Sequence, residues 1–245
     1  MTSVMKNAIK WVEVNSYDEM SGVAADIFTK QLQEKTDSIL GLATGGSPVG
    51  MYEELVKRQQ AGKISFKDVK TFNLDEYVGL EQSNPASYWT FMHDVLFNHV
   101  DMDEENIQLP NGKADDLAIE CQAYDARIAE AGGVDLQLLG IGVNGHIGFN
   151  EPGTPFTSLT NIVELTESTR TENAIYFDNP ADVPTHAITM GIQSIMNAKA
   201  IVLIAFGAKK LEAMEKLRSG NVTEDFPASQ LLNHPNVTVI YGGTN

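Results

Sequence analysis

The sequence has one cysteine among 245 residues, and no apolar run comes near the roughly 18 residues of a membrane-spanning helix. Cys121 by itself can form no internal disulfide, which is typical of proteins from reducing compartments. The first residues also lack the apolar stretch of a secretory signal peptide. These absences predict a cytoplasmic protein that does not enter a membrane.

Basic residues are also scarce. The chain has 17 Lys and Arg against 33 Asp and Glu, which gives a formal net charge of −16. Nucleic acids and anionic membrane surfaces are bound through clusters of Lys and Arg, and no such cluster is present. We therefore expect no nucleic-acid partner and no membrane partner.

Apolar runs alternate with helical patterns, as in βαβ units that form a parallel sheet. A helix is expected from the capping box of Ser16 and Glu19 to about Glu34, and another from near Ala114 to Gly132. The pattern predicts a single α/β domain over residues 1–245, with a Rossmann-like, doubly wound, mainly parallel sheet and helices on both faces. The expected strands are residues 8–14, 38–43, 69–74, 134–142, 200–206 and 237–242.

Ligands of doubly wound sheets bind outside the carboxyl ends of the strands. The residues that follow the strands are therefore the candidates for function. Four segments meet this criterion: Thr44–Pro48, Asp75–Gly79, Asn144–Glu151 and Gly207–Lys210.

The first segment places two glycines between two hydroxyl residues, in the order Thr44, Gly45, Gly46 and Ser47, before a helix expected to begin at Pro48. Exposed amides at a helix start, with two hydroxyls, can bind an anion. An ordinary strand-to-helix turn explains the same residues equally well. The segment is neither a Walker A loop nor a nucleophile elbow.

The second segment begins with Asp75 and Glu76, directly after an apolar strand. A carboxylate there can cap a helix or turn, bind a metal or act as a general base. Metal binding has little support, because the chain lacks paired cysteines, an H-x-x-x-H pair and a D-x-D loop.

The third segment lies in "GIGVNGHIGFNEPG", residues 140–153, which matches the dinucleotide pattern G-x-G-x-x-G. That pattern requires a helix to begin within the glycines, whereas the prolines and glycines here predict a loop. His146 remains, at a strand end beside Asn144 and Glu151. A lone histidine is usually structural, but a carboxylate on a rigid loop next to it favours acid–base chemistry.

With these segments the chain resembles the glucosamine-6-phosphate deaminase family along nearly its whole length. The related 6-phosphogluconolactonases typically have a basic residue after the first carboxylate pair, where this chain has Tyr77, and they lack the F-N-E-P run. The matching motifs are "GLATGGSPVGMYEEL", "VKTFNLDEYVGL", "SYWTFMHDVLFNHVD", "LLGIGVNGHIGFNEPG" and "ITMGIQSIMNAK".

The resemblance implies an enzyme that converts glucosamine 6-phosphate and water to fructose 6-phosphate and ammonia, with no organic cofactor and no metal. It implies that Asp75 is the enolisation base and that His146 opens the sugar ring together with Asn144 and Glu151. The substrate phosphate is expected on the turn of residues 44–47, helped by Lys210.

The chain departs from the family pattern at two positions of the site. Many members have Asp where this chain has Asn144, and an amide cannot carry a proton, so Glu151 is expected to take the larger role. Longer members have a phosphate-binding arginine at the position of Ile175. Arg170 is a conceivable substitute, although a structural role explains it equally well.

Regulated hexameric members have basic residues where this chain has Asn161 and Val163. We therefore expect an unregulated, short-form enzyme that is a monomer or a weak homo-oligomer. Residues 153–178 are a candidate lid. Two other functions stay open: lactone hydrolysis with His146 activating water, and a non-catalytic sugar-phosphate sensor.

Overall fold

The centre of the computed structural model, which describes residues 9–243, is a seven-stranded sheet in which every paired neighbour is parallel. All six expected strands are present, and two of them have the expected bounds, so the predicted parallel sheet is confirmed. In spatial order the strands are β1 (Lys10–Val14), β10 (Val237–Gly242), β9 (Ala200–Phe206), β6 (Leu136–Leu139), β2 (Ile39–Leu42), β3 (Lys70–Asn73) and β5 (Ile107–Gln108).

A second, three-stranded antiparallel sheet was not predicted. Its order is β4 (Asp75–Tyr77), β8 (His186–Thr189) and β7 (Asn161–Glu164). These strands are short, and β4 follows β3 after the single residue Leu74, so the sequence reads as one continuous strand. The small sheet turns Asp75 into a strand residue that pairs with Thr189.

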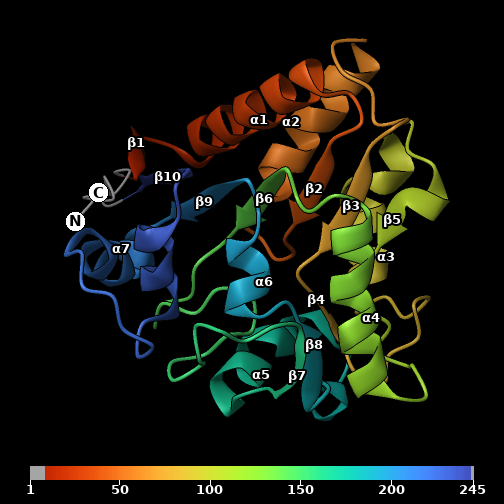
Figure 1. The fold of residues 1–245 in the computed structure, drawn as a ribbon, viewed down its shortest axis with the longest axis vertical. Coiled ribbons are helices and arrows are strands. Elements are labelled where there is room, and N and C mark those ends of the chain that lie inside the picture. Colours follow the sequence, from red (N-terminus) through yellow and green to blue (C-terminus); the bar gives the residue numbers. More distant parts are fainter. Residues whose placement is uncertain (1–8, 244–245) are drawn as a thin grey trace.

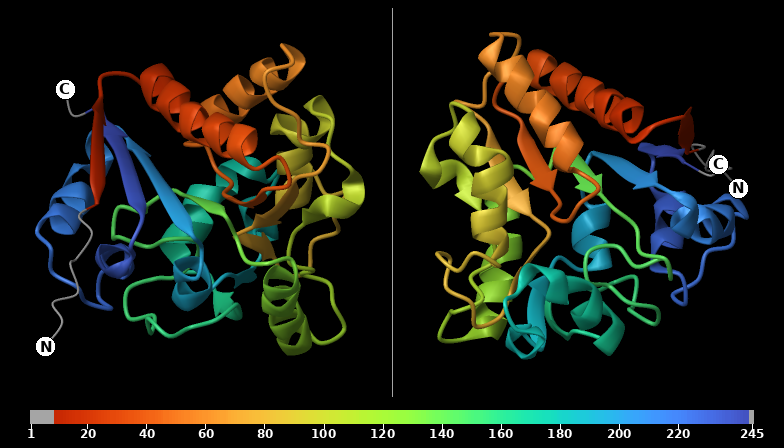
Figure 2. Two further views of the ribbon diagram at one scale, coloured as in Figure 1. Left: turned by 45° about the horizontal axis from the view of Figure 1, so that its top comes forward. Right: turned by 180° about the vertical axis from the view of Figure 1, so that it is seen from behind.

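Helices cover both faces of the large sheet, as expected. In Figure 1, α1 and α2 lie above the sheet and α6, α4 and the small sheet lie below it, and the view from behind in Figure 2 shows the same layers. The helices are α1 (Tyr17–Glu34), α2 (Val49–Gln60), α3 (Tyr88–Val95), α4 (Leu117–Glu130), α5 (Glu167–Asn173), α6 (Ile192–Met196) and α7 (Leu211–Arg218). The 3₁₀ helices are η1 (Phe97–His99), η2 (Glu104–Asn106), η3 (Ala174–Tyr176), η4 (Pro180–Asp182), η5 (Ala208–Lys210) and η6 (Pro227–Asn233).

Two helix predictions can be compared in detail. Helix α1 begins after Ser16, whose hydroxyl accepts the Glu19 N–H, and it ends at Glu34 as predicted. Helix α4 begins after Asp116, whose carboxylate accepts two backbone N–H groups, rather than near Ala114. Cys121 is buried on α4, where loss of water raises the pKa of its thiol to about 11.

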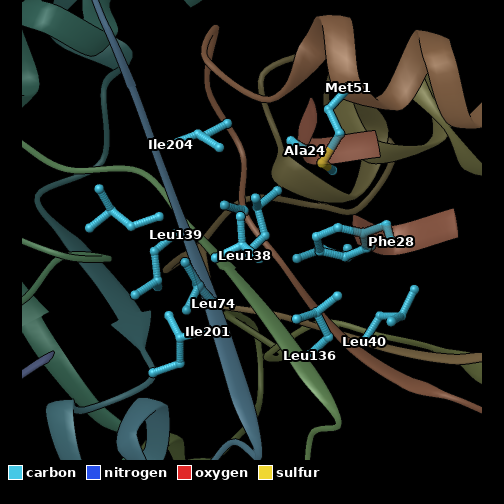
Figure 3. Close-up of a cluster of buried hydrophobic side chains, with 14 of the residues drawn as sticks. Ala24, Phe28, Leu40, Met51, Leu74, Leu136, Leu138, Leu139, Ile201 and Ile204 are labelled. Atoms are coloured by element: carbon cyan, nitrogen blue, oxygen red, sulfur yellow. The ribbon is translucent and has the colours of Figure 1, made fainter. Parts of the chain in front are cut away.

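One continuous apolar core joins the sheet to α1 and α2. Phe28 of α1 and Met51 of α2 are fully buried, and they face strand residues such as Leu40 and Leu138 (Figure 3). Burying one such side chain contributes roughly 1.5–3 kcal/mol. Within residues 9–243, no helix has the length and apolar character that crossing a membrane requires.

Four of the six expected strands have narrower bounds than predicted, and the largest difference is in the strand before the histidine loop. The strand expected at 134–142 ends at Leu139, because the chain then leaves the sheet and closes a loop in which the Gly142 N–H donates to the His146 carbonyl. No helix follows these glycines, which agrees with the rejection of a dinucleotide site. The segment 153–178 is not a plain loop, since it contains β7, α5 and η3.

Candidate active site

A cavity of about 500 Å³ lies at the carboxyl edge of the parallel strands, and all four candidate segments contribute to its wall. This volume is typical of sites for small molecules. The lining residues are Ala43–Pro48, Leu74, Asp75, Tyr77, Pro85, Ala86, Tyr88, Phe91, Gly140–Val143, His146, Gly148, Phe149, Thr169, Asn173, Tyr176, Lys209 and Lys210.

The two neighbouring carboxylates of β4 face different surroundings. Glu76 accepts backbone N–H groups from Tyr77, Tyr88 and Trp89, at 2.8, 3.1 and 2.9 Å. It therefore helps to cap α3 and ties that helix to β4. Asp75 lines the cavity instead. Of the roles that the sequence left open, Glu76 takes that of a cap, and Asp75 as a general base stays a prediction.

Asp75 is buried, with 6% of its surface exposed. Loss of water raises the pKa of its carboxyl to about 8, and the negative charge of Glu76 adds to the shift. Burial also raises the pKa of Glu76, but its three N–H partners oppose this. Glu76 is therefore the member of the pair that ionises more readily, and Asp75 gains and loses its proton near neutral pH.

His146 is held by the two polar residues that the sequence singled out. Its Nδ1 lies 2.8 Å from Asn144 Oδ1 and 3.6 Å from Glu151 Oε1. The Asn144 amide nitrogen donates to Glu151 Oε2 at 2.7 Å, which turns Oδ1 toward the imidazole. In the neutral ring Nδ1 then carries the proton, and Nε2 is the basic nitrogen.

Asn144 and Glu151 lie behind the histidine and do not line the cavity. Glu151 also accepts the Thr169 hydroxyl at 3.2 Å, so it anchors Asn144 from a fixed position. The loop itself is fastened to η6 and to the segment before it: the Ala228 N–H of η6 donates to the Gly145 carbonyl, and the Gly153 N–H donates to the Glu224 carbonyl. The imidazole is therefore oriented mainly through Asn144.

Two glycines give these side chains room. A Cβ on Gly142 would lie 2.3 Å from the His146 ring, so the ring occupies the space of a missing side chain. Gly148 has a φ of +56°, and a Cβ there would lie 2.9 Å from the Thr189 hydroxyl and 3.6 Å from Asp75 Oδ2. Both positions favour glycine because the loop passes so close to His146 and Asp75.

The turn of residues 44–47 lies at the start of α2, with Pro48 as the N-cap rather than as the first helical residue. The first turn of α2 has no acidic residue, so no side chain there neutralises the positive end of the helix. The Tyr17 hydroxyl donates to the Gly46 carbonyl and accepts the Gly50 N–H, both at 2.9 Å. The geometry is that of a braced turn able to hold an anion.

The two other phosphate candidates, and the position where the family arginine is missing, have different surroundings. Lys210 lines the cavity, and its ammonium donates to the Ile141 carbonyl at 2.7 Å. Arg170 does not line the cavity; its guanidinium donates to the Val183 carbonyl at 3.1 Å, which fits a structural role. Ile175 is 78% exposed and supplies no charge.

Sequence reasoning gave no role to several lining residues. Tyr88 lay in the quoted "SYWTF" motif, and its hydroxyl donates to that of Tyr77 at 3.3 Å. Thr169, Asn173 and Tyr176 belong to a segment without a recognisable motif, and only the fold brings them to the cavity. Within residues 9–243, no group of three or more His, Cys, Asp or Glu side chains has the arrangement of a metal site.

Comparison with known proteins gives consistent matches. The model of a family described as glucosamine-6-phosphate isomerases/6-phosphogluconolactonase matches residues 15–240. A glucosamine-6-phosphate deaminase of Lysinibacillus sphaericus is 78% identical over 237 residues, which is 97% of this chain and 100% of the relative. One of Oceanobacillus iheyensis is 52% identical over 232 residues, 95% of this chain and 93% of the relative.

Solved structures give the same result. One described as a monomeric glucosamine-6-phosphate deaminase of the NagB superfamily has a TM-score of 0.94 and 48% identity, covering 96% of this chain and 98% of that chain. A 6-phosphogluconolactonase from Trypanosoma cruzi has a TM-score of 0.78 at 17% identity, covering 98% and 97%, which shows a shared fold.

The chain therefore belongs to the family of glucosamine-6-phosphate isomerases and 6-phosphogluconolactonases. Within that family its relatives at 78% and 52% identity are glucosamine-6-phosphate deaminases, and it is an enzyme of the deaminase type. The resemblance drawn from the five sequence motifs is confirmed.

Proposed function

We propose that the enzyme converts glucosamine 6-phosphate and water to fructose 6-phosphate and ammonia, as an aldose–ketose isomerisation with deamination in amino-sugar catabolism. The observation that carries this proposal is one cavity with two proton-transfer groups. Asp75, with a pKa near neutrality, lines the same space as His146, which is oriented by Asn144 and Glu151.

Ring opening comes first, because the C2 proton becomes acidic only beside an open C1 carbonyl. In our proposal His146 Nε2 takes the proton of the anomeric hydroxyl while the ring C–O bond breaks. The imidazole then returns a proton to the ring oxygen. Asn144 Oδ1 accepts the Nδ1–H throughout, so the ring keeps the tautomer that this step needs.

Asp75 then acts on the open chain. Its carboxylate removes the C2 proton while the C1 oxygen gains the proton that the substrate's ammonium group gives up, which forms an enolamine. The protonated Asp75 then delivers the C2 proton to C1, which leaves a hydroxyl on C1 and a C=N double bond at C2. Water adds to that carbon, and ammonia leaves to give the ketose. A carboxyl with a pKa of about 8 is a much stronger base than an exposed aspartate, so the dry site suits proton abstraction from carbon.

In this proposal the substrate phosphate binds in a different part of the cavity from the reacting carbon atoms. The amides of the turn at 44–47, the hydroxyls of Thr44 and Ser47, and Lys210 are its proposed ligands. Anchoring the phosphate fixes where C1 and C2 lie, which is how remote binding assists the reacting atoms. Arg170 as a ligand stays a prediction that this geometry does not favour.

Lactone hydrolysis and a sensor role are weaker candidates. The lactonase likeness is a likeness of fold at 17% identity, whereas the deaminase relatives share up to 78% of their residues. A sensor needs no buried carboxylate, and burying Asp75 costs stability that binding alone does not repay.

The test is incubation of the chelator-treated protein with glucosamine 6-phosphate while ammonia and fructose 6-phosphate are both measured. We expect equal amounts of the two products. If neither product forms and 6-phosphogluconolactone is hydrolysed instead, the proposed function is wrong. If neither substrate reacts, the sensor becomes the better description.

We further propose that residues 1–245 form one domain that works in the cytoplasm as a monomer or weak homo-oligomer. The main core extends from Val14 to Tyr241 and supports one folding unit, beside a small second cluster of Tyr77, Leu165 and Ala187. A relative of 48% identity is described as monomeric. Sedimentation at micromolar concentration tests the oligomeric state.

A further inference from the structure

Lys210 is the one cationic side chain proposed so far for the substrate phosphate, and the arginine that longer family members add is missing at position 175. The positions considered so far do not supply a second cation: Ile175 is apolar, and the Arg170 guanidinium is occupied by the Val183 carbonyl outside the cavity wall. Among the residues that line the cavity, the Lys and Arg side chains are Lys209 and Lys210. Lys209 lies in the candidate segment Gly207–Lys210, but the sequence gave a role only to Lys210.

The fold brings Lys209 to the phosphate turn. It lies on η5, which follows β9, and in the sheet β9 is separated from β2 only by β6. Tyr17 links the two strand ends directly: its ring packs edge-on against Phe206, the last residue of β9, and its hydroxyl bonds to Gly46 and Gly50. The η5 segment and the turn at 44–47 therefore belong to one end of the cavity.

The two lysines also differ in their contacts. Lys210 is half-buried and donates to Ile141, whereas Lys209 is exposed and has no side-chain hydrogen bond or ion pair within residues 9–243. A protein of net charge −16 repels a phosphate dianion at long range, so the binding end has to supply local positive charge. A lysine ammonium suits this role because it acts as a point charge on a flexible stem.

We propose that Lys209 is a second cationic ligand of the substrate phosphate and replaces the arginine that the chain lacks at position 175. The inference rests on the proposed function, since it concerns the phosphate of that substrate. Lys209 binds and takes no part in proton transfer.

The experiment compares Lys209→Gln with Lys216→Gln. Lys216 lies on α7 outside the cavity wall and pairs with Glu212, so this control makes the same change in net charge. We expect Lys209→Gln to raise both the KM for glucosamine 6-phosphate and the calorimetric Kd of inorganic phosphate by about tenfold, the effect of one lost charge-assisted hydrogen bond. We expect kcat to stay within about twofold, and Lys209→Arg to restore most of the affinity.

Two results overturn the inference. One is that Lys209→Gln has the KM and the phosphate Kd of the Lys216→Gln control. The other is a fall in kcat with phosphate affinity unchanged, because that result places Lys209 outside the phosphate site. If the unaltered protein fails to turn over glucosamine 6-phosphate, the proposed function fails, and the phosphate Kd still decides the role of Lys209.

Discussion

The two sheets contribute to the cavity in different ways. The parallel sheet supplies loops: the turn after β2, the histidine loop after β6 and the lysines after β9. The antiparallel sheet supplies a strand residue, Asp75, which pairs with Thr189 and is buried. In the proposed mechanism, binding and ring opening therefore depend on amides and side chains at loop positions, whereas carbon–proton chemistry depends on a carboxylate held rigidly away from water.

This difference has a physical basis. A phosphate is held well by amides and ammonium groups that remain accessible to solvent. A carboxylate becomes a strong base only when water is removed, and a paired strand excludes water better than a mobile loop does. The small sheet thus creates the environment that raises the pKa of Asp75.

The largest expected effect comes from changing the strand residue. Asp75→Asn removes the proposed base but keeps its size and its pairing with Thr189. We expect kcat to fall by about 10²–10⁴-fold with KM little changed. The matched control is Asp68→Asn at an exposed position. Unchanged turnover of Asp75→Asn would remove Asp75 from the mechanism.

A smaller effect is expected on the loop side. Asn144→Leu removes both the bond from His146 Nδ1 and the bond to Glu151, so the imidazole loses its orientation. We expect kcat/KM to fall by about 10–10²-fold, as for loss of one or two hydrogen bonds. The matched variant Asn144→Asp, which keeps an acceptor for Nδ1–H, should lose much less.

The isotope effect at C2 distinguishes slower ring opening from general damage. With glucosamine 6-phosphate deuterated at C2, slower ring opening masks the carbon–proton step, so the effect in Asn144→Leu should shrink toward unity. An isotope effect larger than that of the unaltered enzyme would show instead that Asn144 affects removal of the C2 proton. The proposed separation of ring opening by loop residues from proton transfer by the strand residue would then be wrong.

The third effect is a shift of the pH profile. The pKa of Asp75 is raised to about 8, and its ionised form is the base, so kcat/KM should rise with pH and level off above about pH 8. Glu76→Gln removes the neighbouring negative charge and should move this rise to lower pH. Because both enzymes use the same substrate, titration of the substrate cancels in the comparison. A profile that does not move would show that burial alone sets the pKa.

The parallel sheet and its loops could be predicted from the sequence, and the antiparallel sheet could not. Long apolar runs such as 200–206 and 237–242 define strands by composition, and the strand-end rule then selects Ser47, His146 and Lys210. The three strands of the small sheet are only three or four residues long. Asp75 of β4 pairs with Thr189 of β8 far along the chain, and β7 pairs with β8 across a segment that holds α5, so no local pattern marks this sheet.

The same distinction applies within the site. The carboxylate pair at 75 and 76 was visible in the sequence, but which member caps α3 depends on where the N–H groups of Tyr88 and Trp89 lie in space. The role of Asn144 as the direct partner of His146 likewise requires side-chain geometry, since the sequence favoured Glu151 for that role. The strand-end rule selected the segment Gly207–Lys210, but the sequence gave a role only to Lys210, and the cavity wall shows that Lys209 belongs to the site as well.

The smallest effect concerns stability. The folded-state pKa of Asp75 lies above its unfolded value, so the folded protein holds this proton more tightly and loses stability as pH rises from about 4 to about 8. An amide at the same position does not ionise. We therefore expect the Tm of Asp75→Asn to exceed that of the unaltered protein by a margin that grows between pH 5 and pH 8, when both are measured by calorimetry. Asp68→Asn should show no such trend. A Tm difference that stays constant with pH would mean that the strand does not shield Asp75 from water. The two sheets would then differ in where they place their residues but not in the chemical environment that they provide.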